Sequence, residues 1–390
     1  MTWPHLEYET RPWAPTLDRG LSRRRVREYR SALVPRIAES TPSLGTATWA
    51  LLDAATIAVA KFEGVHAHGV VPFAPLLLRS ESMASSRIEN LTSSARKVLE
   101  AELTAAGSPS ARLIVANTRL MREAIEEDSP STDAIRAMHR VLLREDAPEI
   151  AGELRTEPVW IGGREDSPRD ALFVPPHQDQ VKELLGDLEA FMARTDIPAL
   201  AHAAVAHAQF ETIHPFAGGN GRTGRALVHV MLKKHGLSRG TALPVSAGLL
   251  AQTTTYFTAL DDYREGKVEP IVKLFAEAAV QAAEQGTWLS RQLQEIQREW
   301  KARLNARGDA LAWDVLPLLL RRPVLTASAV AEELHTSSPN ARNALDRLSK
   351  DGIVVAANLD KRTRAWRSPE VLEVLDEFAE AAGRRSDAPD

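Results

Sequence analysis

The chain has 390 residues, 44% of them hydrophobic and 26% charged, which is the size and composition of a globular protein with two or three domains. Its formal net charge is −4, which excludes a global attraction to nucleic acid or to an anionic membrane and leaves only local patches for such binding. It has no cysteine, which excludes disulfides and thiolate catalysis, and it has no signal-peptide pattern, so we expect a cytoplasmic protein.

Helical periodicity dominates the N-terminal third of the chain. Its most apolar run, residues 49–60, is too short for a membrane span and contains Asp53, so we expect a buried helix and no membrane partner. The expected elements are an irregular or extended arm over 1–20, a basic helix over 21–40 that Pro35 interrupts, a helix through about Lys61, and two helical pieces within 72–103.

The middle of the chain predicts helices around one β-prone segment. Residues 152–176 hold two β-prone runs on either side of a turn rich in Gly, Asp, Ser and Pro, which is typical of a hairpin. The expected helices cover 111–127, 132–144, 178–194, 198–213 and about Asn220 to His235.

The last third is expected to be helical over 245–300, and its pattern changes after a break at 307–309. Three short helices followed by two β-like runs predict a winged helix-turn-helix. Their expected ranges are 312–321, 326–334 and 338–350 for the helices, and 353–356 and 364–366 for the β-like runs.

Residues 214–225 read HPFAGGNGRTGR and combine a histidine, a glycine-rich turn and two arginines. Glycines at a helix start let phosphate oxygens approach the backbone N–H groups, and the helix dipole adds positive charge. Arg222 and Arg225 lie three residues apart on one helix face, which suits a di- or triphosphate. With His214 as a proton acceptor, the segment predicts phosphoryl or nucleotidyl transfer. The structural alternative is a helix-capping turn beside a core histidine.

This segment resembles the signature of the Fic family, HPFx[D/E]GNGRxxR, and matches it everywhere except at the acidic position. The resemblance extends over roughly residues 20–280 and includes the hairpin segment and the segment 246–266. It implies a mainly α fold: a Fic-type helical core with a small β-hairpin flap, followed by the winged helix-turn-helix. The expected domains are N-terminal helices over 1–107, the Fic core over 108–280, a connecting helix over 281–310, the winged helix-turn-helix over 311–380 and a disordered tail over 381–390.

The resemblance implies a protein adenylyltransferase that uses ATP as substrate, with Mg²⁺, and transfers AMP to a Ser, Thr or Tyr hydroxyl of a target protein. His214 would be the general base and Phe216 would support the loop. The ATP phosphates would be bound by Gly219, Asn220, Gly221, Arg222 and Arg225. The flap residues Val159, Trp160, Ile161, Gly162 and Gly163 would dock the target as an added edge strand. Tyr256 would lie on the adenine side.

The acidic position of the family signature is Gly218 in this chain. In the family that carboxylate ligates Mg²⁺, so here the ion would depend on phosphates, waters and Asn220. Two interpretations stay open: adenylyl transfer with weaker metal binding, or altered or little chemistry.

Residues 85–90 read SSRIEN, which has the form [S/T]xxxE[G/N] that marks an inhibitory helix in many Fic proteins. By resemblance Glu89, in a motif with Ser85 and Asn90, would form an ion pair with Arg225. Arg225 could then not bind the γ-phosphate. Breaking a buried ion pair costs roughly 3–5 kcal/mol, which is enough to suppress turnover. The structural alternative is a solvated helix glutamate, and removal of AMP stays open as an activity.

Residues 321–367 hold nine Lys/Arg and five Asp/Glu, a net charge of +4 within a net-negative chain. The expected recognition helix would expose side chains that read base edges: Asn340, Arg342, Asn343 and Arg347. The alternative function is therefore a nucleotide-binding, DNA-binding regulator with a weak or altered Fic site. A protein-binding or dimerisation module is the alternative for this region, and the resemblance also implies a homo-oligomer.

Overall fold

The computed structural model describes residues 3–13, 28–67, 73–104, 107–164, 167–239, 241–308, 310–360 and 363–383. The chain divides into two compact units, each assembled from segments that are distant in the sequence. The first unit comprises residues 1–53, 126–236 and 254–276, and the second comprises 54–125, 237–253 and 277–390. Two helices, α1 (Thr46–Ala67) and α11 (Glu269–Arg303), run from one unit into the other.

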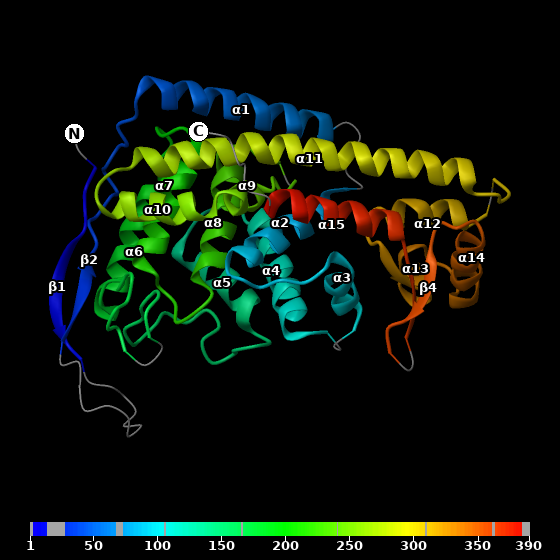
Figure 1. The fold of residues 1–390 in the computed structure, drawn as a ribbon, viewed down its shortest axis with the longest axis horizontal. Helices are drawn as coiled ribbons and strands as arrows, with labels where there is room; N and C mark the ends of the chain where they lie inside the picture. Colours follow the sequence, from blue (N-terminus) through cyan, green and yellow to red (C-terminus); the bar gives the residue numbers. More distant parts are fainter. Residues whose placement is uncertain are drawn as a thin grey trace. The chain divides into compact units, whose positions relative to one another are not determined.

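The first unit is built around α7, whose alanine-rich sequence is a strong helix former and is buried along almost its whole length. α7 packs against α6 and α8, and α5 packs against α8 (Figure 1). Its elements are β1 (Glu7–Pro12), β2 (Glu28–Leu33), α5 (Thr132–Leu143), α6 (Gln178–Ala193), α7 (Ala199–Ile213), α8 (Asn220–Lys234) and α10 (Thr253–Arg264).

A glycine lets α7 and α8 approach closely. A Cβ atom at Gly224 of α8 would lie 2.5 Å from a carboxylate oxygen of Glu211 and 2.9 Å from the ring of Phe210, both on α7. The absence of a side chain at this position therefore sets the packing distance of the two helices that carry the signature segment.

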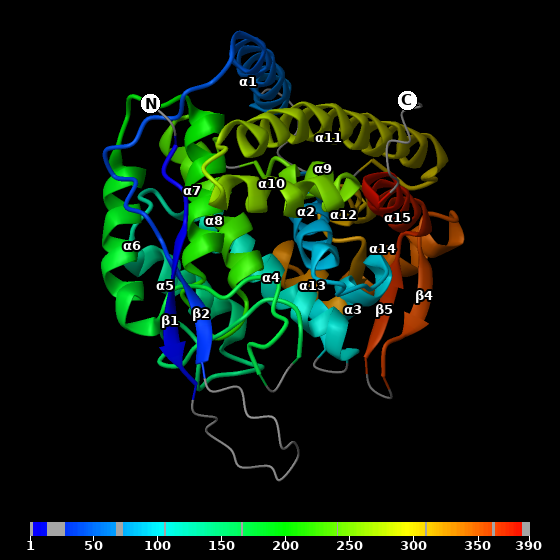
Figure 2. The same ribbon diagram turned by 60° about the vertical axis from the view of Figure 1, so that its left-hand side comes forward.

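The strands β1 and β2 form an antiparallel pair in which Glu7 lies opposite Leu33 and Pro12 opposite Glu28 (Figure 2). The predicted helix over 21–40 is wrong in its described part, since residues 28–33 form a strand. Backbone pairing with β1 overrides the local helical pattern. Residues 14–27, which hold the rest of that prediction and the end of the expected arm, lie outside the described residues.

The second unit is also mainly helical. α15 packs against α2, α3 and α9, and α2 packs against α9. Its elements are α2 (Ala74–Ile88), α3 (Ala95–Leu103), α4 (Pro109–Glu126), α9 (Val245–Ala251), α12 (Ala312–Leu319), α13 (Ala327–Glu333), α14 (Ser338–Lys350), α15 (Pro369–Gly383), β3 (Val324–Thr326), β4 (Val355–Asn358) and β5 (Arg364–Arg367).

The segment 312–367 contains the three expected helices and the two expected strands, with shifted ends. A third, unexpected strand, β3, completes an antiparallel sheet of order β3-β5-β4, of which Figure 2 shows β4 beside β5. The helix α15 was not predicted, although its buried residues Val371, Leu375, Phe378 and Ala382 recur with helical spacing. The assignment of this region as a DNA-binding winged helix-turn-helix stays a prediction, and residues 384–390 of the expected tail lie outside the described residues.

The described fold is mainly α with small β-hairpins, as the sequence predicts. None of the helices in the described part of the chain combines the length and the apolar character that a membrane span needs.

Candidate active site

His214 ends α7 in a left-handed backbone conformation, with φ 50° and ψ 62°. Its N–H still donates to the carbonyl of Phe210 at 2.9 Å, and Pro215 then disfavours continuation of the helix. A left-handed conformation costs a non-glycine residue roughly 1–2 kcal/mol, so contacts from elsewhere in the fold must hold it.

Arg155 supplies those contacts. Its Nε donates to the carbonyl of His214 at 2.8 Å, its Nη2 donates to the carbonyl of Pro176, and its backbone N–H donates to the carbonyl of Pro215 at 3.0 Å. Burial lowers the pKa of Arg155 to about 10, so the guanidinium stays cationic at neutral pH. Arg155 was not predicted as a site residue, and its only signal in the sequence is its place in the segment 152–176, just before the first β-prone run.

The imidazole of His214 is kept neutral. Its side chain is 19% exposed, and its Nδ1 lies 3.8 Å from a carboxylate oxygen of Glu211. Burial, the largest cause, and the cations of Arg155 and Arg264 together lower the pKa of His214 to about 3, while the backbone of Glu211 opposes the shift. A carboxylate beside Nδ1 favours the tautomer protonated there, which leaves Nε2 as a proton acceptor. The negative charge of a bound phosphate would raise this pKa toward neutrality.

The loop after His214 is closed by Asn220. Its Nδ2 donates to the carbonyl of Phe216 at 2.9 Å, and its Oδ1 accepts the N–H of Phe216 at 2.9 Å. Both ends of the amide are thus committed to one residue. The side chain of Asn220 therefore stabilises the loop. Because its oxygen already accepts a hydrogen bond from Phe216, it is not placed as the metal ligand that was expected from the sequence.

The buried ring of Phe216 stacks on His139, with ring centroids 3.7 Å apart and an angle of 3° between the planes. The N–H of Gly152 donates to His139 Nδ1 at 2.9 Å, so Nε2 carries the proton and donates to the carbonyl of Gly218 at 2.8 Å. Burial, the largest cause, lowers the pKa of His139 to about 4, which agrees with a neutral ring. His139 is a second support of the loop that the sequence analysis missed.

The N-terminus of α8 offers an anion site. Gly219 is its N-cap, and its carbonyl accepts the first helical hydrogen bond, from Thr223 N–H at 3.1 Å. The N–H groups of a first helical turn have no acceptor within the helix, and this turn contains no acidic residue. Arg222 and Arg225 are buried on α8, and their positive charges lower the pKa values of His139 and His207, respectively. The site is therefore electropositive.

The two glycines of the loop differ in what they tolerate. Gly219 has φ 75°, and a Cβ there would lie 3.0 Å from Leu142, whereas a Cβ at Gly218 would meet no described atom within 4 Å. We expect Gly219→Ala to lower the free energy of unfolding by about 1–2 kcal/mol and Gly218→Ala to leave it within about 0.5 kcal/mol. Urea unfolding of the two variants measures this, and equal effects would contradict the loop geometry.

The segment 158–174 folds back on itself through isolated β-bridges and contains no regular strand in its described part. Ile161 N–H donates to the carbonyl of Phe173 at 2.8 Å, and Leu172 N–H donates to the carbonyl of Ile161 at 2.8 Å. Gly162 and Gly163 take left-handed conformations at the turn, while Trp160 Nε1 donates to the carbonyl of Arg164 at 2.6 Å and Val159 is half-buried.

Arg264 is another missed cation near His214. Its guanidinium lies 3.8 Å from the ring centroid of Phe173 and pairs with Asp261 at 2.8 Å. Through Phe173 it contacts the hairpin segment, and its charge helps to keep His214 neutral.

Tyr256 lies in the interior of the first unit. It is 1% exposed, and its hydroxyl is hydrogen-bonded to His207 Nε2 at 2.8 Å. The adenine-side role that the sequence analysis gives it stays a prediction. The described residues contain no group of three or more His, Asp or Glu side chains arranged to hold a metal ion.

The SSRIEN segment lies in the second unit, where Glu89 is the C-cap of α2 and Ser85 is fully buried. Asn90 follows with φ 61°, and Leu91 N–H donates to the carbonyl of Ser86 at 3.1 Å, which ends the helix. Glycine and asparagine are the residues that best tolerate this conformation, which explains why the pattern ends in Gly or Asn.

Residues 129–232 match the family model described as "Fic/DOC family". The chain is 31% identical over 162 residues to "Protein adenylyltransferase fic-1" of Caenorhabditis elegans, and 26% identical over 159 residues to "Protein adenylyltransferase Fic" of Aedes aegypti. Each match covers 40% of this chain and only 29% of the relative.

Among solved structures, a Fic family protein from Desulfovibrio desulfuricans G20 superposes with a TM-score of 0.57 at 22% identity, over 84% of this chain and 98% of that one. At this identity the likeness concerns the fold alone. The family model itself identifies a Fic/DOC family domain over residues 129–232.

Proposed function

We propose that the chain is a protein adenylyltransferase, which transfers AMP from ATP to a Ser, Thr or Tyr hydroxyl of a target protein. The observation that carries the proposal is the neutral imidazole of His214, whose backbone carbonyl is fixed by Arg155, directly before an electropositive helix N-terminus. The names of the Caenorhabditis and Aedes relatives, both protein adenylyltransferases, support it.

In this proposal the backbone N–H groups of Gly219, Asn220 and Gly221 bind the phosphates of ATP, with Arg222 and Arg225 adding charge. His214 Nε2 accepts the proton of the target hydroxyl, and that oxygen bonds to the α-phosphorus. The bond between the α-phosphorus and its bridging oxygen to the β-phosphate breaks, and pyrophosphate leaves with the electron pair.

The hairpin segment 158–174 would hold the target chain beside His214. Its bridged arms leave Leu172 86% exposed, which offers an apolar contact to an extended target chain. Backbone pairing would bring a target hydroxyl to the base without demanding one sequence around it.

The loop does not supply the side-chain ligand that Mg²⁺ would need at position 218, because the residue is glycine and the amide of Asn220 is committed to Phe216. Mg²⁺ would therefore enter with ATP, held by phosphates and water, and no step of the proposal depends on it.

A carboxylate at position 218 fits the structure, because a Cβ atom there would have no described atom within 4 Å. We expect Gly218→Asp to lower the Mg²⁺ concentration for half-maximal AMP transfer by about tenfold or more. This is the size of the change in metal affinity that is typical when one contact at a metal site is altered. Gly218→Asn is the matched control of similar size without the charge. Equal Mg²⁺ dependence of both variants would show that position 218 does not face the metal.

We further propose that Glu89 restrains this activity, because it stands in the inhibitory pattern and caps α2. A glycine at a helix C-cap is well tolerated, so Glu89→Gly removes the carboxylate with little cost to the helix. The function itself is tested by incubating this variant with ATP and reading the modified side chain by mass spectrometry. AMP on a hydroxyl supports the proposal, and phosphate alone or no modification contradicts it.

A further inference from the structure

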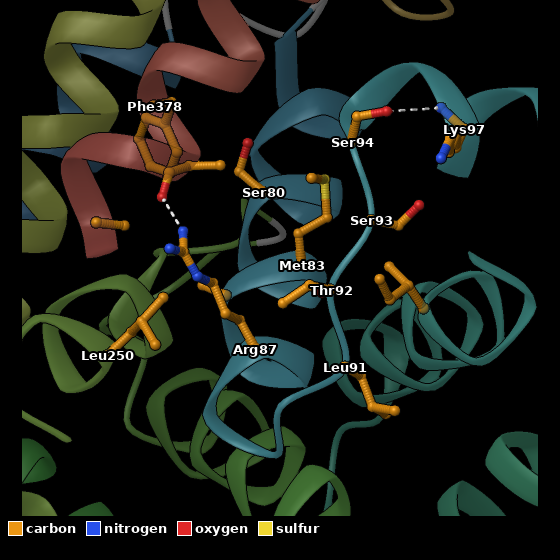
Figure 3. Close-up of a pocket in the computed structure, with 14 residues that line it drawn as sticks. Ser80, Met83, Arg87, Leu91, Thr92, Ser93, Ser94, Lys97, Leu250 and Phe378 are labelled. Carbon is orange, nitrogen blue, oxygen red and sulfur yellow. Dashed lines mark hydrogen bonds between the residues drawn. The ribbon is translucent and has the colours of Figure 1, made fainter. Parts of the chain in front are cut away.

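The second unit contains a cavity of about 400 Å³ between α2, α15 and the segment that joins α2 to α3 (Figure 3). This volume falls in the range of roughly 300–1,000 Å³ that is usual for small-molecule sites. The cavity has no part in the proposed transfer, whose residues belong to the first unit.

One part of the cavity lining is apolar. Met83 of α2, Ile114 of α4, Leu250 of α9 and Phe378 of α15 all line it. Ile114 and Phe378 are 1% and 2% exposed, so they are fixed by the surrounding core. This part can bury a hydrocarbon chain or ring.

The charged part of the lining is entirely basic. It includes Arg87 and Lys97 and no Asp or Glu, although the whole chain has 52 acidic and 48 basic residues. The carboxylate of Asp376, on the neighbouring face of α15, accepts the N–H of Ala95 at 2.9 Å. The potential in the cavity therefore favours an anion.

Arg87 is placed to bind that anion. Its side chain reaches from α2 toward α15 beside Phe378 (Figure 3). Its Nη1 donates a hydrogen bond to the carbonyl of Ala379 at 2.9 Å, and a guanidinium has further N–H donors that can bind a carboxylate or sulfonate.

We infer that this cavity is a binding site for a small amphipathic anion, with its carboxylate or sulfonate on Arg87 and its apolar body against Met83, Ile114 and Phe378. Arg87 is also the third residue of the SSRIEN segment. The ligand would compete with the carbonyl of Ala379 for its guanidinium and would thus act on the helix that carries Glu89.

The probe for this site is 8-anilinonaphthalene-1-sulfonate, an aromatic sulfonate whose fluorescence rises in apolar surroundings. Titration of the full chain should give saturable 1:1 binding with a Kd on the order of tens of µM. Decanoate should displace the probe and ATP should not. Binding that does not saturate, or displacement by ATP, would overturn the inference.

Two variants test the assignment of the site. Arg87→Ala should weaken probe binding at least tenfold, as loss of a charge-assisted hydrogen bond does. The matched control is Arg112→Ala, which also removes an arginine that donates to a backbone carbonyl, that of Gly107 at 2.9 Å. Ala84→Leu should block binding by filling the cavity while Arg87 stays in place. Near-UV circular dichroism checks that Arg87→Ala and Ala84→Leu are folded like the wild type. If both are folded and still bind the probe with wild-type affinity, the proposed site is wrong.

Discussion

Replacing His214 by alanine in a Glu89→Gly background is expected to reduce AMP transfer by at least about 100-fold, the usual contribution of a general base. The structure gives the reason: His214, whose imidazole is neutral and whose backbone carbonyl is held by Arg155, ends α7 beside the electropositive start of α8. Transfer of the α-phosphorus label of ATP to protein measures the effect. His335→Ala is the matched control, because His335 is also a left-handed histidine, with φ 49°, but lies outside the Fic domain.

The same labelling assay distinguishes the role of His214 as general base from the proposed inhibitory role of Glu89. Glu89→Gly alone should label faster than the wild-type chain, whereas Asn90→Gly should not, since it keeps the carboxylate and suits the left-handed conformation at that position. If the double variant Glu89→Gly/His214→Ala transfers the label to protein as fast as Glu89→Gly alone, His214 is not the general base.

The second large effect is a loss of stability in mild acid. His139, His202 and His207 are each 0% exposed, and burial lowers their pKa values to about 4, 4 and 3. In the unfolded chain a histidine has a pKa near 6.5, so below that pH the unfolded state binds protons that the folded state does not bind. Acid therefore stabilises the unfolded state relative to the folded state. Between about pH 7.5 and 5 each histidine should therefore cost about 2 kcal/mol, or about 6 kcal/mol together, most of it below pH 6.5.

Urea unfolding at about pH 7.5, 6.5 and 5 measures this loss, which should be small above pH 6.5 and steep below it. The His139→Gln variant lacks one of the three histidines that bind a proton on unfolding. Its free energy of unfolding should therefore fall by about 2 kcal/mol less than that of wild type between about pH 7.5 and 5. A free energy of unfolding that is flat over this range would mean that these rings are not buried as neutral groups.

The signature segment was predictable because its chemistry is local. The glycine turn, the start of α8 and the spacing of Arg222 and Arg225 all follow from twelve consecutive residues. Long periodic helices such as α7 were predicted for the same reason.

The supports of the site were not predictable, because they act across the fold on backbone atoms. His139 donates to the carbonyl of Gly218, 79 residues away, and Arg155 donates to the carbonyl of His214, 59 residues away. A backbone acceptor imposes no residue type on its own position, so nothing in the sequence marks the partnership. Strand β2 was misassigned for a related reason, since its pairing with β1 depends on a segment that local periodicity does not consider.

The central claim is that this Fic domain transfers AMP, and the most direct test is which phosphate of ATP reaches the protein. The full-length Glu89→Gly variant should be incubated with Mg²⁺ and with ATP labelled either at the α- or at the γ-phosphorus. The account predicts acid-stable protein labelling from the α-label and none from the γ-label. Labelling from the γ-phosphate, or equal labelling of a variant that also carries His214→Ala, would contradict it.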